Sequence, residues 1–164
     1  MAKVKVDIKL GKNFKDLAKD KVFLTRSAVV IQRNIRANTK EGIGWDGEGF
    51  PSLSGSTIAR RRALSAVNKT DRFYSAVKAN ATFTGDLVSK IVAEVKGTKI
   101  VLKGKGRHKL LRGIRVKYLD GSNAQIGEIL DGLKKIGYRI LGVSEKSKKM
   151  IKNEAIRALR RLRR

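Results

Sequence analysis

The stretch LVSKIVAEVKGTKIVLK, residues 87–103, decides the fold class of this chain. It is rich in Val and Ile, and its two apolar runs, Leu87–Val95 and Thr98–Lys103, are joined at Gly97. Short β-branched runs separated by a glycine turn predict two strands of an antiparallel hairpin. Near the N-terminus, residues 3–10 alternate apolar with charged side chains, which predicts a further half-buried strand. The sequence therefore predicts an antiparallel sheet.

Two amphipathic helices flank the predicted strands. The first covers residues 14–38, and its apolar stripe consists of Phe14, Leu17, Leu24, Ala28, Ile31 and Ile35. The second begins after Ser144 as N-cap and has an apolar side made of Ile151, Ala155, Leu159 and Leu162. Together these elements predict an α+β fold, with a mainly antiparallel sheet packed by a long N-terminal helix and a basic C-terminal helix. We expect residues 1–164 to form a single domain with flexible loops at about 41–56 and 103–122.

Three other segments have weaker patterns. Ser54 or Ser56 can cap a short helix over the residues that follow. Residues 124–136 fit either a helix or a short strand, because two glycines weaken the helical pattern. Residues 138–143 predict a strand, whereas 66–83 favour no structure.

The charge of the chain is far from balanced. Lys and Arg number 39 against 14 Asp and Glu, which gives a formal net charge of +25. A domain usually carries a net charge of only about 2 to 8, so this surplus predicts a polyanion or an oppositely charged protein as partner. With no Cys and with His108 as the only His, the sequence excludes disulfides, a thiol nucleophile and multi-His metal sites. No apolar run approaches the ~18 residues of a membrane span. We therefore expect a protein made in the cytoplasm that meets no membrane, catalyses no reaction and holds no cofactor or metal.

Basic segments are the main candidates for binding. The arginines at 60–62, the loop at 103–117 and the terminal helix can each neutralise phosphates. Low aromatic content and the lack of a helix-turn-helix signature predict contact with the nucleic-acid backbone and not with bases. A solvated face, or contact with an acidic protein, explains the same charges equally well. The residues expected to face DNA or a protein partner are Arg60, Arg61, Arg62, Arg107, Lys109, Arg112 and Arg115.

The segment EGIGWDGEGF, residues 41–50, combines four Gly, three acids and the only Trp. Two interpretations are open: Trp45 can fold back onto the core, or Trp45 and Phe50 can anchor a contact between subunits. In the second, the acidic loop of one copy meets the basic face of the next, and such a head-to-tail contact can close into a ring. The interface residues predicted in this way are Glu41, Trp45, Asp46, Glu48, Phe50 and Leu53.

Three motifs resemble, in sequence order, the signature of tailed-phage virion-morphogenesis and tail-completion proteins. They are GFPSLSGSTIARR at 49–61, TGDLVSKI at 84–91 and RILGVS at 139–144. The resemblance extends over about two thirds of the chain, from Trp45 to the C-terminus. Ile140 stands where that family usually has a Pro.

This resemblance implies a non-enzymatic subunit of a neck or tail-completion ring, similar to a tail terminator, with an α+β fold. The implied ring is a hexamer that joins the head connector and portal-side neck proteins to the tail tube or terminator protein, around a channel for genomic DNA. The implied location is the neck or tail of the virion, after assembly in the host cytoplasm. The charge alone favours an alternative, a sequence-independent nucleic-acid-binding protein of the nucleoid or ribosome-associated type.

Overall fold

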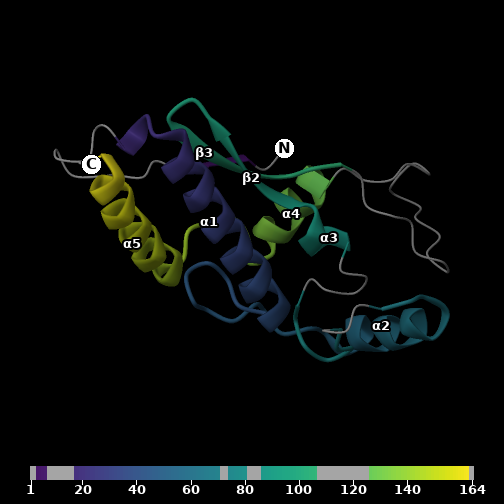
Figure 1. Ribbon diagram of the computed structural model, residues 1–164. Coiled ribbons are helices and arrows are strands. Elements are labelled where there is room, and N and C mark those ends of the chain that lie inside the picture. The colour runs from purple at the N-terminus through teal and green to yellow at the C-terminus, as the bar shows by residue number, and fades with distance from the viewer. Residues whose placement is uncertain (1–2, 7–16, 71–73, 81–85, 107–125, 163–164) are drawn as a thin grey trace.

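A computed structural model describes residues 3–6, 17–70, 74–80, 86–106 and 126–162, and the predicted α+β class is confirmed (Figure 1). In chain order the elements are β1 (Lys3–Val6), α1 (Lys21–Glu41), α2 (Gly55–Val67), α3 (Asp86–Ser89), β2 (Ile91–Lys96), β3 (Lys99–Gly104), α4 (Ile126–Lys135) and α5 (Glu145–Leu162).

The sheet has three strands in the order β1-β3-β2, all antiparallel to their neighbours. Lys96 pairs with Lys99, so the predicted hairpin closes through a two-residue turn in which Gly97 has a φ of +58°. The strand predicted from residue 87 begins only at Ile91, because residues 86–89 form the helical turn α3. Leu87 and Val88 are both buried in this helical turn, which contacts α1.

Three layers make up the main body of the molecule. The helix α1 packs against the sheet, α5 packs against α1, and α4 lies against β3 (Figure 1). The core joins all of them, with Ile100 and Leu102 from the sheet, Ile31 from α1, Ile126 from α4 and Ile151 from α5. The C-terminal helix therefore reaches the core beside α1.

The first helix is shorter at its start than predicted. It begins at Lys21 because Asp20 is the N-cap, whose carboxylate accepts from the backbone N–H of Val22 at 2.8 Å and of Phe23 at 3.3 Å. The helix ends at Glu41, and Gly42 is its C-cap with a φ of +75°. The predicted stripe is confirmed for Leu17, Leu24, Ala28, Ile31 and Ile35, which are all buried, while Phe14 lies outside the described residues.

Two assignments near the C-terminus are decided by local hydrogen bonds. The sequence left a helix or a short strand open for residues 124–136, and the structure has a helix over residues 126–135. The strand predicted at 138–143 is wrong: the Tyr138 N–H donates to the Leu133 carbonyl at 2.9 Å, and the Ile140 N–H to the Tyr138 carbonyl at 3.1 Å, so the backbone turns. Ser144 caps α5 as predicted, since its Oγ accepts from the Ser147 N–H at 3.2 Å.

Candidate assembly surfaces

The glycine-rich segment after α1 folds into a closed turn over residues 42–51. Ile43 and Gly49 form an antiparallel bridge. The Gly44 N–H donates to the Glu48 carbonyl at 2.7 Å, and the Phe50 N–H donates to the Gly42 carbonyl at 2.8 Å. Gly47, with a φ of +92°, sits at its tip.

This turn packs on the segment just before α5. The Trp45 N–H donates to the Arg139 carbonyl at 2.9 Å, and the Asp46 carboxylate pairs with the Arg139 guanidinium. The Trp45 ring lies directly over Gly142, where an added Cβ would come within 2.2 Å of the ring Cγ. Residues almost a hundred positions apart thus form one unit. Apart from their place in a motif, no sequence pattern indicates these roles of Arg139 and Gly142.

The two aromatic residues of the turn have different surroundings. Phe50 is buried, and its ring centroid lies 4.8 Å from that of Tyr138. Burial also raises the pKa of the Tyr138 hydroxyl. Trp45 keeps 39% of its surface exposed. Phe50 is therefore part of the core of this chain, whereas Trp45 packs on Gly142 and still presents one side outward, so that its contact with a second subunit stays a prediction.

Two of the three acids in the segment already have partners in the same chain. A hydrogen bond from Arg139 holds the pKa of Asp46 below its usual value. Glu41 pairs with Lys78 at 3.3 Å. Glu48 is exposed and makes no ion pair within the described part of the chain. A head-to-tail attraction through this segment would depend mainly on Glu48.

The helix α2 forms an arm together with the segment 74–80. Ser54 is its N-cap, accepting from the Thr57 N–H at 3.3 Å, and none of the 13 helical residues is buried. Figure 1 shows α2 standing apart from α1 and the sheet.

Arg61 ties the helix to the rest of this arm. Its guanidinium donates to the Lys78 carbonyl at 2.8 Å and lies 5.1 Å from the centre of the Tyr74 ring, while the Tyr74 hydroxyl donates to the Arg61 carbonyl at 2.8 Å. Arg60 and Arg62 are exposed. Of the three predicted basic residues, the middle one thus has a structural role, and the outer two are available to a partner.

A hollow of about 290 Å³ opens at the base of the arm. Phe50, Leu53, Val77 and the Glu41–Lys78 ion pair contribute to its lining, so three of the predicted interface residues meet there. Val77 is 57% exposed; it lies in the stretch for which the sequence favoured no structure, and only its apolar character could have indicated it.

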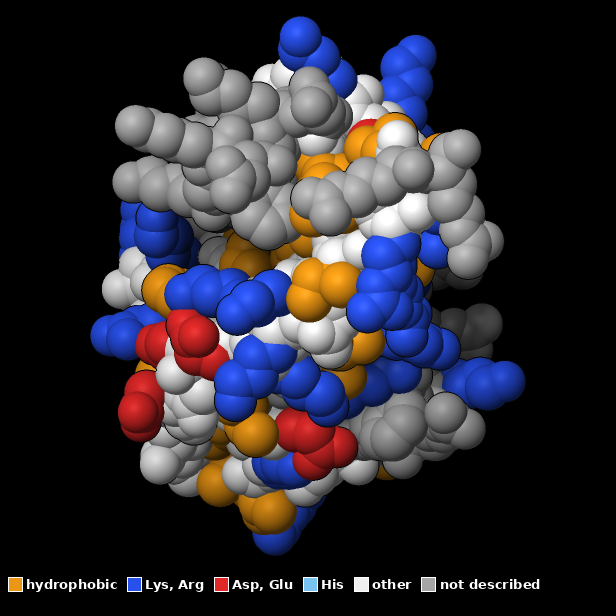
Figure 2. Space-filling view, turned by 60° about the vertical axis from the view of Figure 1, so that its left-hand side comes forward, with side chains coloured by type: hydrophobic (Ala, Val, Ile, Leu, Met, Phe, Trp, Pro, Cys, Tyr) orange, Lys and Arg blue, Asp and Glu red, His pale blue; other side chains and the backbone are white. Residues whose placement is uncertain are grey.

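A second surface is basic and belongs to α5. Figure 2 brings the α5 side of Figure 1 forward and shows Lys and Arg side chains across much of that face.

The other basic residues predicted to face DNA or a partner lie outside the described residues: Arg107, Lys109, Arg112 and Arg115. The same is true of His108.

Neither a metal cluster nor a membrane helix is found in the described parts of the chain. No group of three or more His, Cys, Asp or Glu is placed there to hold a metal ion. No described helix is long and apolar enough to cross a membrane. Comparisons with protein-family models, with curated proteins and with solved structures find no match for this chain.

Proposed function

We propose that this chain is a non-enzymatic structural subunit of a tailed-phage neck or tail-completion ring, which joins the head connector to the tail tube around the DNA channel. The observation that carries the proposal is the α2 arm. Isolated helices shorter than about 12 to 15 residues are marginal in water, and α2, with 13 residues, has no buried residue to stabilise it. The arm also exposes Val67 and Val77 by more than half. A surface of this kind is expected on a subunit whose arm is covered only after assembly.

The motifs that resemble the phage proteins support the same function. Residues 49–61 supply Phe50, Ser52 and Leu53 to the lining of the hollow and also include the cap and the first half of α2. Residues 139–144 form the segment on which the turn packs. Leu87, Val88 and Ile91 of the second motif are buried. The first and third motifs therefore both contribute to the base of the arm, while the second contributes to the core of the body.

The arm favours a head-to-tail contact over a symmetric one. It is cationic through Arg60 and Arg62 and has no acid between residues 55 and 67, so two α2 helices repel each other. A contact between the arm of one copy and the body of the next uses two different surfaces, and closes into a ring if the rotation allows. Because the contact is repeated around the ring, many weak contacts together stabilise the assembly.

The mass of the purified protein tests this proposal. We expect native mass spectrometry and sedimentation to give a closed oligomer, a hexamer under the resemblance. Val67→Glu in the arm places a carboxylate in the contact and shifts the population to monomers. The matched control is Val22→Glu, because Val22 is similarly exposed, at 49% against 56%, and lies in the first turn of α1, where a carboxylate is tolerated.

A chain that stays monomeric at high concentration would contradict the ring and favour the nucleic-acid-binding alternative. Equal effects of the two substitutions would show that the arm has no special part in assembly.

A further inference from the structure

The outward face of α5 is a row of cations on a rigid support. Its opposite side is buried against α1 through Ser147, Ile151, Ala155 and Ala158. The Asn34 amide donates to the Ser147 Oγ at 2.9 Å and fixes the seam between the two helices. The exposed cations that make no ion pair with a described residue are Lys146, Lys149, Lys152 and Arg160. From Lys146 to Arg160 the row is about 21 Å long, at ~1.5 Å per residue.

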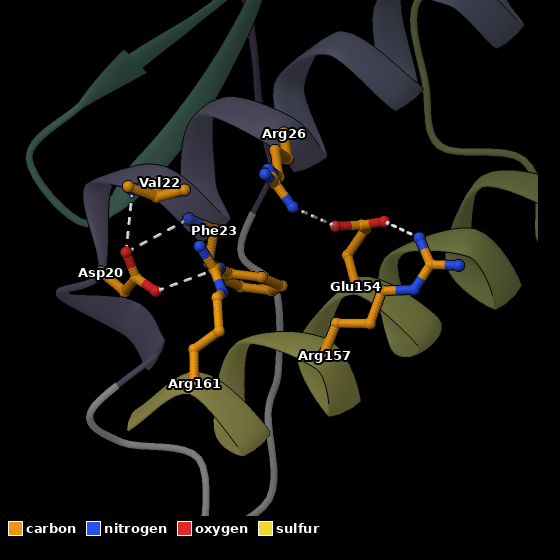
Figure 3. A network of polar contacts seen from close by, with 7 residues as sticks. All are labelled: Asp20, Val22, Phe23, Arg26, Glu154, Arg157 and Arg161. Atoms are coloured by element: carbon orange, nitrogen blue, oxygen red, sulfur yellow. Dashed lines mark hydrogen bonds and ion pairs between the residues drawn. The ribbon is translucent and has the colours of Figure 1, made fainter. Parts of the chain in front are cut away.

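The acids near this row are turned away or neutralised (Figure 3). Glu154 points into the seam, where one oxygen lies 3.6 Å from Arg26 and the other accepts from Arg157 at 2.9 Å. Asp20, at the start of α1, lies 3.9 Å from Arg161. Glu145 pairs with Lys148 in the first turn of α5. The four unpaired cations therefore face the solvent, and the one acid beside them on α5, Glu145, is already paired with Lys148.

The chemistry of the row fits a regular series of phosphates. Along a duplex, each strand carries one charge per ~3.4 Å, so the row spans about six phosphates. The described part of α5, residues 145–162, contains no aromatic residue on which an unpaired base could stack. A face with cations and no stacking platform suits the outside of a double helix better than a single strand.

We propose that the outer face of α5 binds the phosphate backbone of double-stranded DNA without reading its sequence. Lys146, Lys149, Lys152 and Arg160 make the contacts, and the seam with α1 keeps them in line. The choice of duplex DNA over an acidic protein rests on the proposed function, because a neck ring encloses the genome.

The test compares two variants with the same loss of charge. In the first, Lys146, Lys149, Lys152 and Arg160 are replaced by Gln. In the control, four exposed cations on other surfaces are replaced by Gln: Arg33, Lys96, Lys134 and Lys135. Fluorescence anisotropy measures binding to a short labelled duplex of random sequence over a range of salt concentrations. Circular dichroism checks that both variants fold.

We expect the logarithmic salt slope of binding to fall by about 3 to 4 in the α5 variant, at ~0.9 per phosphate contact, and by less than about 1 in the control. Equal losses in the two variants, or no binding of the duplex at low salt, would overturn the inference. So would tighter binding of poly-glutamate than of the duplex, since it would assign the row to an acidic protein.

The inference and the proposed function fail separately. A monomer that binds DNA through α5 removes the ring and keeps the inference. A ring whose binding of DNA is indifferent to the α5 substitutions removes the inference and keeps the ring.

Discussion

The helices α2 and α5 are both basic, yet the structure supports them in different ways. On α5, four side chains are buried against α1 and two ion pairs cross the seam, so its cations stand on a fixed surface. On α2 nothing is buried, and Arg61 is used to hold the arm together. Charge alone therefore does not define a role: the same residue types form a solvent-facing row on a packed helix in α5 and part of an uncovered arm in α2.

The largest difference between the two helices should appear when the same substitution is made in each. Ile151→Ala in α5 removes a side chain that is 5% exposed, whereas Ile58→Ala in α2 removes one that is only partly buried. We expect Ile151→Ala to lower the free energy of unfolding by about 2 to 4 kcal/mol, because it leaves a cavity. Ile58→Ala should cost less than about 1 kcal/mol. Urea titration of the two variants at a protein concentration that keeps them monomeric measures both.

Similar losses in the free energy of unfolding for the two substitutions would contradict this difference between the helices, since they would mean that α2 is packed as firmly as α5. If Ile58→Ala lowered the free energy of unfolding more at concentrations where the chain assembles, this result would support the difference, because it would place Ile58 at a contact with another copy.

An effect of intermediate size is expected where the turn over 42–51 meets the segment that leads to α5. Gly142→Ala forces the Trp45 ring to move, because the new methyl group would overlap it. We expect a loss of about 1 to 3 kcal/mol in the free energy of unfolding, and a blue- or red-shifted Trp fluorescence spectrum that reports the displaced ring. The control is Gly132→Ala in α4, where nothing lies within 4 Å of the added carbon and φ is not positive. It should be neutral or stabilising.

An unchanged Trp spectrum in Gly142→Ala would contradict the contact between the turn and this segment. The attachment of the arm would then depend on the Glu41–Lys78 ion pair and not on the Trp45 ring.

Sequence periodicity predicted the parts of the fold that depend on local repetition. The apolar stripes through Ile31 and Ile151 follow a helical period, and the hairpin is marked by Gly97, so each could be recognised from a few neighbouring residues. The start of α1 could not be recognised in this way. Leu17 fits the helical period, but Asp20 is the N-cap, so the helix begins only after it. Residues 138–143 have the alternation of a strand, with Tyr138 and Ile140 buried, but no strand in the described part of the chain pairs with them. Pairing partners are not visible in a local pattern.

The candidate site was predicted only in part, for the same reason. The sequence indicated that Trp45 and Phe50 are unusual for a loop rich in glycine. It could not show that Gly142 lies beneath Trp45 or that Arg139 neutralises Asp46, because these contacts depend on how distant segments pack. An acid that appears free in the sequence, such as Asp46, can have its partner almost a hundred residues away.

The smallest predicted effect concerns the ion pair that holds the turn near the arm. Arg139 lowers the pKa of Asp46 in the folded state, so the pair stabilises the fold above the usual Asp pKa of about 3.9. That contribution is lost as the pH falls below this value, and because Arg139 is 62% exposed it should amount to less than about 1 kcal/mol. Asp46→Asn should therefore reduce stability at pH 7 and match the unchanged protein near pH 2, when urea unfolding is compared at both values.

The matched control is Glu48→Gln in the same turn, which removes a carboxylate without an ion pair to a described residue and should not alter stability at pH 7. If the two substitutions lower stability at pH 7 equally, net charge and not the pair with Arg139 sets the effect, and the turn has no ionic anchor comparable to the one that Glu154 gives α5.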